Sequence, residues 1–137
     1  MPLHSREGGV MNGKSIVLDT NILLYFLNGD PNVSSFLLDY EPIVPFVTEL
    51  ELLSAPELSA SEKLSIQEIL QDLTVIKYAE KHKDDIVKLR AQKKLKLPDA
   101  IIASLAITLG LPLVTADKAL RNIPDIDVIF YEVSGNG

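Results

Sequence analysis

Four carboxylates in this 137-residue sequence stand where a metal site could form. They are Asp19, Glu51, Asp99 and Asp117. Each lies close to an apolar segment, and none has a histidine or cysteine nearby, since the chain contains no cysteine and its two histidines are at positions 4 and 82. A site built only from oxygen ligands favours hard cations, so Mg²⁺ or Mn²⁺ is expected rather than zinc.

Four carboxylates in one crevice repel one another unless a cation or protons neutralise them. Such a cluster commonly serves phosphodiester hydrolysis, in which the metal activates water and stabilises charge on the attacked phosphate. Each acid alone also has a structural explanation. Asp19 and Asp117 could cap helices, and Asp99 could offset a helix dipole. Glu51 could complete a capping box with Thr48, so the chemical hypothesis requires all four acids to meet in the fold.

The apolar segments predict a parallel sheet that brings the acids to one edge. Residues 16–18 are an unbroken apolar run, typical of a strand buried on both faces, and residues 22–27 begin a helix behind Asp19. Further strands are expected at residues 43–46, 74–76, 112–115 and 128–131. Helices alternate with these strands, which predicts an α/β fold with about five short parallel strands and helices on both faces. Ligands would bind at the carboxyl edge, at a switch point between the first and fourth strands.

Capping signals place the helices between these strands. A helix is expected at residues 21–28, and Asp30-Pro31 starts a second helix that Pro42 should end. The box from Thr48 to Glu51 predicts a third helix that begins at Thr48. Ser59 or Ser61 should cap a fourth helix. Two more helices are expected over residues 80–95 and 98–109, the second closed by Gly110.

Composition limits the class of protein. The net charge of −6 and pI of about 4.8 argue against a protein that grips nucleic acid by its overall charge. The longest apolar run, residues 22–27, is too short to span a bilayer. Residues 1–10 lack the apolar segment of a signal peptide, so no signal peptide is expected there. We expect a cytoplasmic protein with one domain at residues 15–132. Residues 1–14 are expected to be a disordered lead or foreign to the native protein, and residues 133–137 a loose tail.

One segment departs from the acidic character of the chain. Residues 77–96 hold eight basic and three acidic residues, a net charge of +5 in a chain of −6. One interpretation is a solvated helix face, on which His82 is simply exposed. The alternative is a local contact with phosphates, through Lys93, Lys94 and Lys96.

Four short stretches resemble the PIN domain. They are VLDTN at residues 17–21, VTELELL at 47–53, LPDAIIAS at 97–104 and LVTAD at 113–117. Within that family the chain is most similar to VapC-type toxins, the ribonuclease half of toxin–antitoxin pairs. The resemblance covers residues 15–131, and the LDTN and LPDAIIA stretches are its specific parts.

The resemblance implies a three-layer α/β/α sandwich, a homodimer, RNA cleavage with Mg²⁺ or Mn²⁺, and a small antitoxin partner. It implies that the four acids named above are the catalytic, metal-binding residues, with Asn21 and Thr115 supporting them. Two positions depart from the family pattern: Ser54 replaces a frequent glycine, and Leu120 replaces a frequent aromatic residue. Glu49 is a rival to Glu51, which is preferred because Thr48 precedes it by three residues.

Two alternatives remain open at this point. The chain could be a PIN nuclease that acts in RNA processing and is not a toxin. It could instead be a non-catalytic metal-binding or phospho-receiver-like module of the same fold class. A phospho-receiver would need paired acids after the first strand, but Thr20 follows Asp19. Growth arrest on expression, and a neighbouring antitoxin gene, would distinguish the toxin from the processing nuclease.

Overall fold

The structure is a computed structural model that describes residues 14–132. The domain boundaries expected near residue 14 and at 133–137 therefore fall at or outside the ends of the described part. Five parallel strands form one sheet in the order β3-β2-β1-β4-β5. Their bounds are β1 Ser15–Leu18, β2 Glu41–Pro45, β3 Thr74–Ile76, β4 Leu113–Thr115 and β5 Val128–Phe130. The predicted sheet is confirmed, including the switch point between the first and fourth strands.

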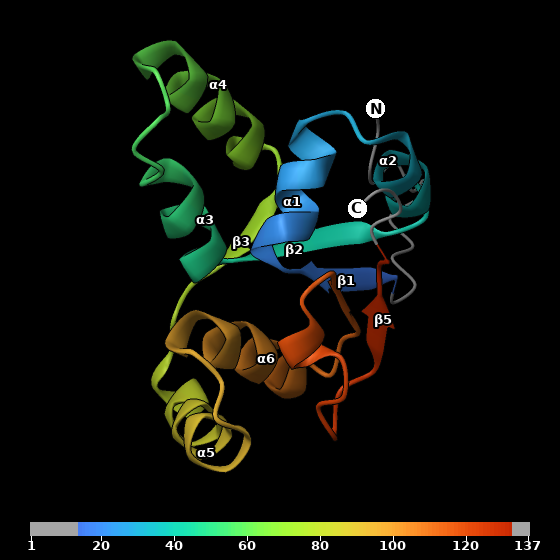
Figure 1. Ribbon diagram of the computed structural model, residues 1–137, viewed down its shortest axis with the longest axis vertical. Helices are drawn as coiled ribbons and strands as arrows, with labels where there is room; N and C mark the ends of the chain where they lie inside the picture. The colour runs from blue at the N-terminus through green and yellow to red at the C-terminus, as the bar shows by residue number, and fades with distance from the viewer. Residues whose placement is uncertain (1–13, 133–137) are drawn as a thin grey trace.

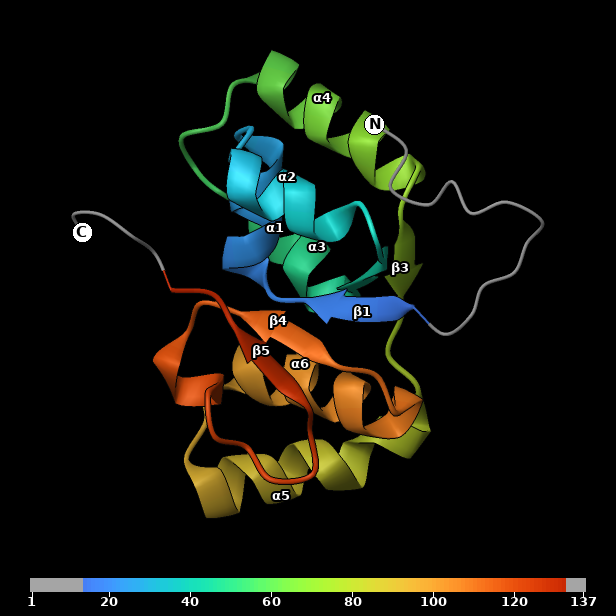
Figure 2. The same ribbon diagram turned by 90° about the vertical axis from the view of Figure 1, so that its right-hand side faces the viewer.

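Helices cover both faces of this sheet (Figures 1 and 2). One side carries α1 Thr20–Leu27, α2 Pro31–Leu37, α3 Phe46–Leu53 and α4 Ala60–Gln71, and the other carries α5 Lys83–Lys93 and α6 Leu97–Leu109. Two short 3₁₀ helices, η2 Glu80–His82 and η3 Lys118–Leu120, complete the fold. This is the expected three-layer α/β/α sandwich.

The strands supply two separate apolar cores because successive side chains point to opposite faces of a sheet. Val17 packs in the core beneath α5 and α6, together with Leu89 and Ile102. Its neighbours Ile16 and Leu18 pack in the second core, beneath α1 and α2. The continuous apolar run of β1 is therefore explained by burial on both faces.

Pro42 does not end the second helix, contrary to the prediction from the sequence. Helix α2 already ends at Leu37, and Pro42 lies buried inside β2. The amide of Glu41 donates to the carbonyl of Lys14 on the β1 side, so Pro42 faces the other side of the strand. Pairing with β3 begins only at Ile43, so the missing N–H of proline removes no bond from the sheet.

The predicted start of the third helix is also wrong. Helix α3 begins at Phe46, with Pro45 as an N-cap that makes no side-chain hydrogen bond. Thr48 is therefore inside the first turn and fully buried, where its hydroxyl lies 3.2 Å from that of Thr20 on α1. The extended backbone of Pro45 ends the strand and starts the helix, so no capping box with Glu51 forms.

The charged segment forms η2 and α5 instead of one helix over residues 80–95. His82 at the junction is buried, with 2% of its surface exposed, which contradicts the expected exposure. Its Nδ1 lies 3.3 Å from the hydroxyl of Thr108 on α6, and its ring meets that of Tyr78 edge-on. Burial lowers the pKa of His82, so the neutral ring is the form that packs here.

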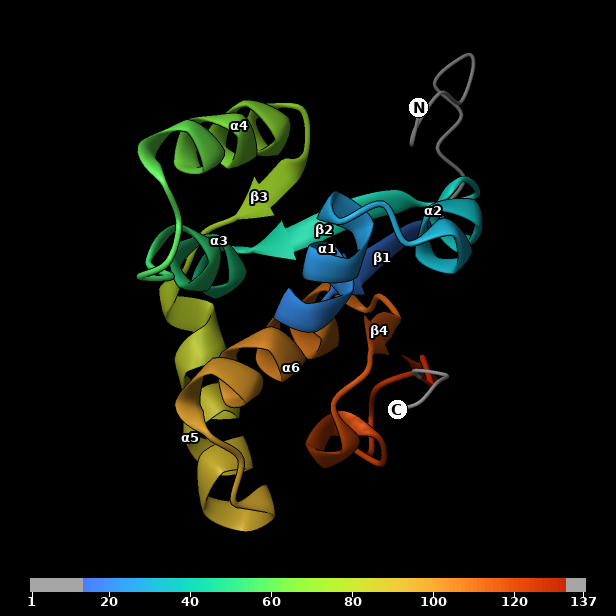
Figure 3. The same ribbon diagram turned by 45° about the horizontal axis from the view of Figure 1, so that its top comes forward.

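Helix α6 positions the third acid. It begins at Leu97, one residue before the prediction, with Pro98 in its first turn, and Gly110 closes it at a φ of +66° as expected. Its central residues are buried against the sheet, so its N-terminal end is fixed beside the carboxyl ends of β1 and β2. Helices α1, α3 and α6 meet there (Figure 3).

None of the helices in residues 14–132 has the length and apolar character needed to cross a bilayer.

Candidate metal centre

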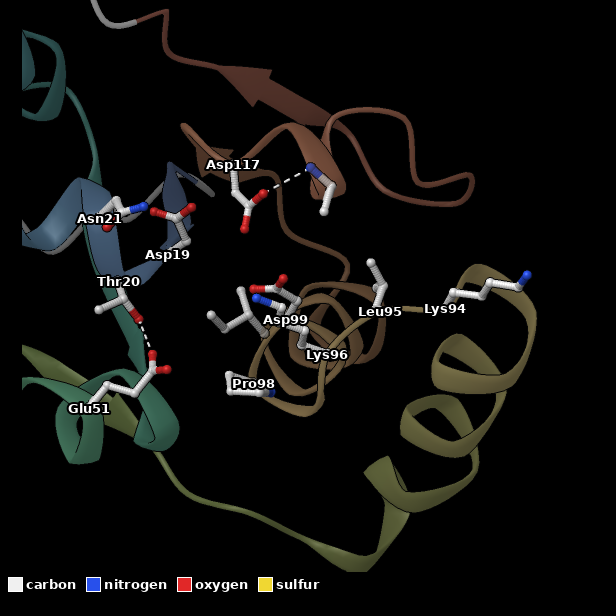
Figure 4. A pocket seen from close by; sticks show the side chains of 12 residues that line it. Asp19, Thr20, Asn21, Glu51, Lys94, Leu95, Lys96, Pro98, Asp99 and Asp117 are labelled. Atoms are coloured by element: carbon white, nitrogen blue, oxygen red, sulfur yellow. Dashed lines mark hydrogen bonds between the residues drawn. The ribbon is translucent and has the colours of Figure 1, made fainter.

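All four predicted acids line one cavity of about 490 Å³ at the carboxyl edge of the sheet. Figure 4 shows Asp19, Asp99 and Asp117 turned toward a common space, with Glu51 on the opposite wall. Its remaining lining residues are Thr20, Asn21, Lys94, Leu95, Lys96, Pro98, Ile102 and Ala119. Residues that are far apart in the chain thus meet because parallel strands end at one edge.

Asp19 is the most buried of the four acids. It directly follows β1, caps α1, and keeps only 3% of its surface exposed. Its Oδ1 accepts a hydrogen bond of 2.9 Å from the amide of Ile22, and its Oδ2 accepts one from the hydroxyl of Thr115. Burial raises the pKa of Asp19 and nearby Asp117 adds to the rise, while these hydrogen bonds and one from the Ala116 amide oppose it. Asp19 is therefore both the helix cap and a member of the acid cluster.

Thr115 connects the first acid to the fourth. Its hydroxyl is fully buried, donates to Asp19 and accepts a bond of 2.9 Å from the backbone amide of Asp117. The Oδ1 of Asp117 in turn accepts from the Ala119 amide at 2.9 Å and caps η3. One hydroxyl therefore fixes the positions of two acids from different strands.

Glu51 is held by Thr20, which was not among the predicted site residues. The hydroxyl of Thr20 donates to Glu51 Oε1 at 2.6 Å, and because it has one proton, the contact with Thr48 must use the proton of Thr48. The available signal was the place of Thr20 in VLDTN, directly after Asp19. The rival acid Glu49 lines a different cavity, between α3 and α4, so the structure brings Glu51 and not Glu49 to the cluster.

The raised pKa of Asp99 shows that the four acids interact. Burial is the largest cause that raises the pKa of Asp99 to about 6, followed by the charge of Asp117 and a hydrogen bond with its carboxyl group. The charges of Asp19 and Glu51 raise it further. All three other acids therefore act on Asp99, as expected for carboxylates that share one site.

This set of side chains fits a hydrated divalent cation. Within residues 14–132 no three acidic or histidine side chains converge into a ready-made closed set of ligands. Mg²⁺ rarely needs such a set, because it keeps several waters and is held through one or two carboxylates. An open cavity with oxygen ligands and repulsion among its acids suits an ion of that kind, and Asp19, Glu51, Asp99 and Asp117 are the residues that would hold it.

The three predicted lysines do not all lie at the cavity. Lys94 and Lys96 line it, as Asn21 does, but Lys93 is not among the lining residues. The two departures from the family pattern have structural explanations. Ser54 caps the end of α3 at a φ of −97°, so glycine is not needed there. Leu120 is fully buried in the core, where an apolar side chain is sufficient.

Comparisons with known proteins agree with this geometry. A family model described as the PIN domain matches residues 16–126. A solved toxin–antitoxin complex from Klebsiella pneumoniae has a chain that is 28% identical, with a TM-score of 0.76 over 87% of this chain and 100% of that one. Among curated protein sequences no match was found.

Two further solved structures share the fold at lower identity. VapBC2 from Rickettsia felis, bound to a DNA fragment from its promoter, aligns with a TM-score of 0.74 at 22% identity, over 85% of this chain and 98% of that one. FitAcB from Neisseria gonorrhoeae aligns with a TM-score of 0.67 at 24% identity, over 85% and 96% of the two chains.

Proposed function

Because the chain belongs to the PIN-domain family and resembles its VapC-type members, we propose that it is a metal-dependent endoribonuclease, the toxin of a type II toxin–antitoxin pair. The observation that carries the proposal is the single cavity into which Asp19, Glu51, Asp99 and Asp117 all face. A cluster of carboxylates with no histidine or cysteine suits phosphodiester hydrolysis with Mg²⁺ or Mn²⁺. The expected substrate is RNA, and the expected location is the cytoplasm.

A bound divalent cation would supply a water of lowered pKa and a positive charge beside the attacked phosphate. The chain's own residues prepare the site for it. Hydrogen bonds from Ile22 and Thr115 keep the Asp19 carboxylate in place, so it would not need to move when a cation binds. The pKa of Asp99 is raised to about 6, so near that pH it holds a proton that a bound cation would displace. Thr20 directs the Glu51 carboxylate from the opposite wall.

The wild-type protein tests the catalytic proposal directly. Purified chain is incubated with a long single-stranded RNA in Mg²⁺, in Mn²⁺ and in EDTA, and the fragments are mapped. We expect discrete cuts in either metal and none in EDTA. Metal binding without cleavage would favour the alternative of a non-catalytic module, and cleavage that persists in EDTA would contradict the proposed role of the acids.

The toxin assignment adds two partners, a small antitoxin and a second copy of the chain in a homodimer. The solved neighbour from Klebsiella pneumoniae is part of a toxin–antitoxin complex, which supports the antitoxin. An apolar partner segment would need exposed apolar side chains near α1. Ile22 and Leu23 are buried, but Leu24 is 36% exposed, and Tyr25 and Phe26 are half-buried. We place the antitoxin on this surface, near α1, α2 and α4.

Induced expression distinguishes the toxin from a nuclease of RNA processing. The toxin should arrest growth, and a small protein encoded beside it should restore growth and co-purify with it. Leu24→Asp should weaken that co-purification, while Val87→Asp, at a 61% exposed position on α5, serves as the control. Growth that continues while RNA is cut would favour the processing alternative.

A further inference from the structure

The turn between α5 and α6 brings two lysines to the acid cavity in an unusual way. Helix α5 ends at Lys94, which has a left-handed φ of +58° although it is not glycine. The next residue, Leu95, is buried in the core and anchors the turn. Lys96 follows as the N-cap of α6, and both lysines line the cavity. A left-handed residue often ends a helix, but it is usually glycine, so a lysine in this conformation is unfavourable.

Lys96 also stands where helix energetics disfavour it. The N-cap position prefers a short polar side chain, and the helix dipole is positive at this end. Lys96 makes no capping hydrogen bond, so neither of these preferences is met. It is three residues before Asp99, on the same side of the first turn, and Figure 4 shows it beside that acid. The sequence thus places a cation next to the acids at some cost to the helix.

Neither lysine is committed to an ion pair. In the described part of the chain the one ion pair within 4.0 Å joins Lys83 and Glu80, away from this cavity. Lys94 and Lys96 are both exposed, and their ammonium groups remain available to an anion that enters the cavity. In Figure 4, Lys94 extends outward, farther from the acids than Lys96.

We propose that Lys94 and Lys96 form a phosphate-binding wall of the cavity that seats the backbone of a single-stranded RNA. This inference rests on the proposed nuclease function and names the residues that hold its substrate. Lys96 contacts a phosphate next to the acids, and Lys94 contacts one farther along the strand. Such contacts position a strand without reading its sequence. An acidic protein with a net charge of −6 thereby gains a local contact for a polyanion.

Lys93 provides a matched control, because it is adjacent in sequence but does not line the cavity. Its removal changes the net charge of the chain by the same amount as removal of Lys94 or Lys96. If the basic segment attracted RNA only by its overall charge, removal of any of the three lysines would weaken RNA binding equally. If Lys94 and Lys96 contact phosphates in the cavity, their removal should weaken RNA binding more than removal of Lys93.

Two further signatures separate a substrate contact from a purely structural role. Lys96 repels a divalent cation, so Lys96→Gln should bind Mn²⁺ more tightly while it binds RNA more weakly. Lys94→Gly removes the backbone strain together with the charge, so it should raise the melting temperature while it weakens RNA binding. A structural residue would not give opposite changes of this kind.

The experiment compares wild type with Lys93→Gln, Lys94→Gln, Lys94→Gly and Lys96→Gln. A fluorescent single-stranded RNA is titrated in EDTA over a range of salt, and KM and kcat are measured in Mn²⁺. We expect each change at Lys94 or Lys96 to weaken RNA binding about tenfold and to reduce its salt slope by roughly 0.7. KM should rise more than kcat falls, and Lys93→Gln should stay within about twofold of wild type in affinity.

The outcomes distinguish this inference from the proposed function. Wild-type protein that cleaves RNA while all three lysine positions behave alike would overturn the phosphate wall and leave the nuclease intact. Wild-type protein that cleaves no RNA in either metal would overturn the proposed function, and the inference with it. A Lys94→Gly variant that gains stability and keeps full RNA affinity would remove Lys94 from the wall.

Discussion

The raised pKa of Asp99 predicts that removing its charge stabilises the metal-free protein. The perturbation is Asp99→Asn, which keeps the shape of the side chain. In the folded protein the pKa of Asp99 is about 6, against 3.8 for the ordinary carboxyl group. At about 1.4 kcal/mol for each pKa unit, ionised Asp99 costs the folded state at most about 3 kcal/mol. Partial exposure and a lost helix-dipole contact reduce the expected gain to about 1–2 kcal/mol.

The sign of the effect depends on pH. Below about pH 4 Asp99 is protonated in both the folded and the unfolded protein, so it does not lower the free energy of unfolding. Between pH 4 and 6 the unfolded chain loses the proton first, and wild-type stability falls as the pH rises. Above pH 6 Asp99 is ionised in both states, and the full loss of stability is present. Asp99→Asn should therefore be more stable than wild type at pH 7.5, and the two should converge near pH 4.

Thermal unfolding in EDTA measures this difference. A gain of 1–2 kcal/mol corresponds to roughly 3–8 °C in the melting temperature of a domain of this size. Added Mn²⁺ should raise the melting temperature of wild type more than that of the variant, because it relieves the repulsion that the variant lacks. A variant that is less stable than wild type at pH 7.5, or a difference that stays constant with pH, would refute the reasoning.

Three further predictions test the supports of the site and the fold. Thr20→Val leaves Glu51 without its hydrogen bond, so RNA cleavage should fall about tenfold. The melting temperature should fall as well, because the buried Thr48 hydroxyl loses its contact with Thr20. Gly110→Ala should lower the free energy of unfolding by about 1 kcal/mol, measured by urea titration, because φ is +66° there although no atom crowds the new methyl group. Ser59→Ala removes one side of the capping box with Glu62 and should cost about 1 kcal/mol in the same titration.

The sheet and the meeting of the acids could be predicted because they depend on the period and length of apolar runs. The third strand was predicted at its observed bounds, residues 74–76, and the first to within one residue. Parallel strands must end at one edge, so Asp19 and Asp117 had to approach each other once the strand order placed β1 beside β4. This part of the site follows from topology and needs no side-chain detail.

The errors lie where two local signals compete or where a distant contact decides. Thr48 matched a capping box, but Pro45 ended the strand earlier and made Thr48 an interior residue. His82 stands in a charged segment, and only its contact with Thr108 on another helix shows that it is buried. Pro42 is typical of a helix end, and the sequence does not show that this position of β2 has no hydrogen-bond partner on the β3 side.

The sequence also could not show which lysines of the basic segment line the cavity. Net charge marks the segment at residues 77–96 but does not rank its members. The backbone at Lys94 is left-handed and Leu95 is buried, and Lys94 and Lys96 line the cavity whereas Lys93 does not. Both depend on tertiary packing, so the sequence pattern alone could not separate Lys93 from Lys96.

One comparison tests most directly the proposal that Asp19 holds the catalytic cation. RNA cleavage in Mn²⁺ is measured for wild type, for Asp19→Asn, and for Glu49→Gln as a control in which an acid outside the cavity is neutralised. We predict that Asp19→Asn loses roughly 100-fold or more in rate while its melting temperature holds or rises, and that Glu49→Gln cleaves like wild type. A folded Asp19→Asn variant that cleaves as fast as wild type would contradict the account.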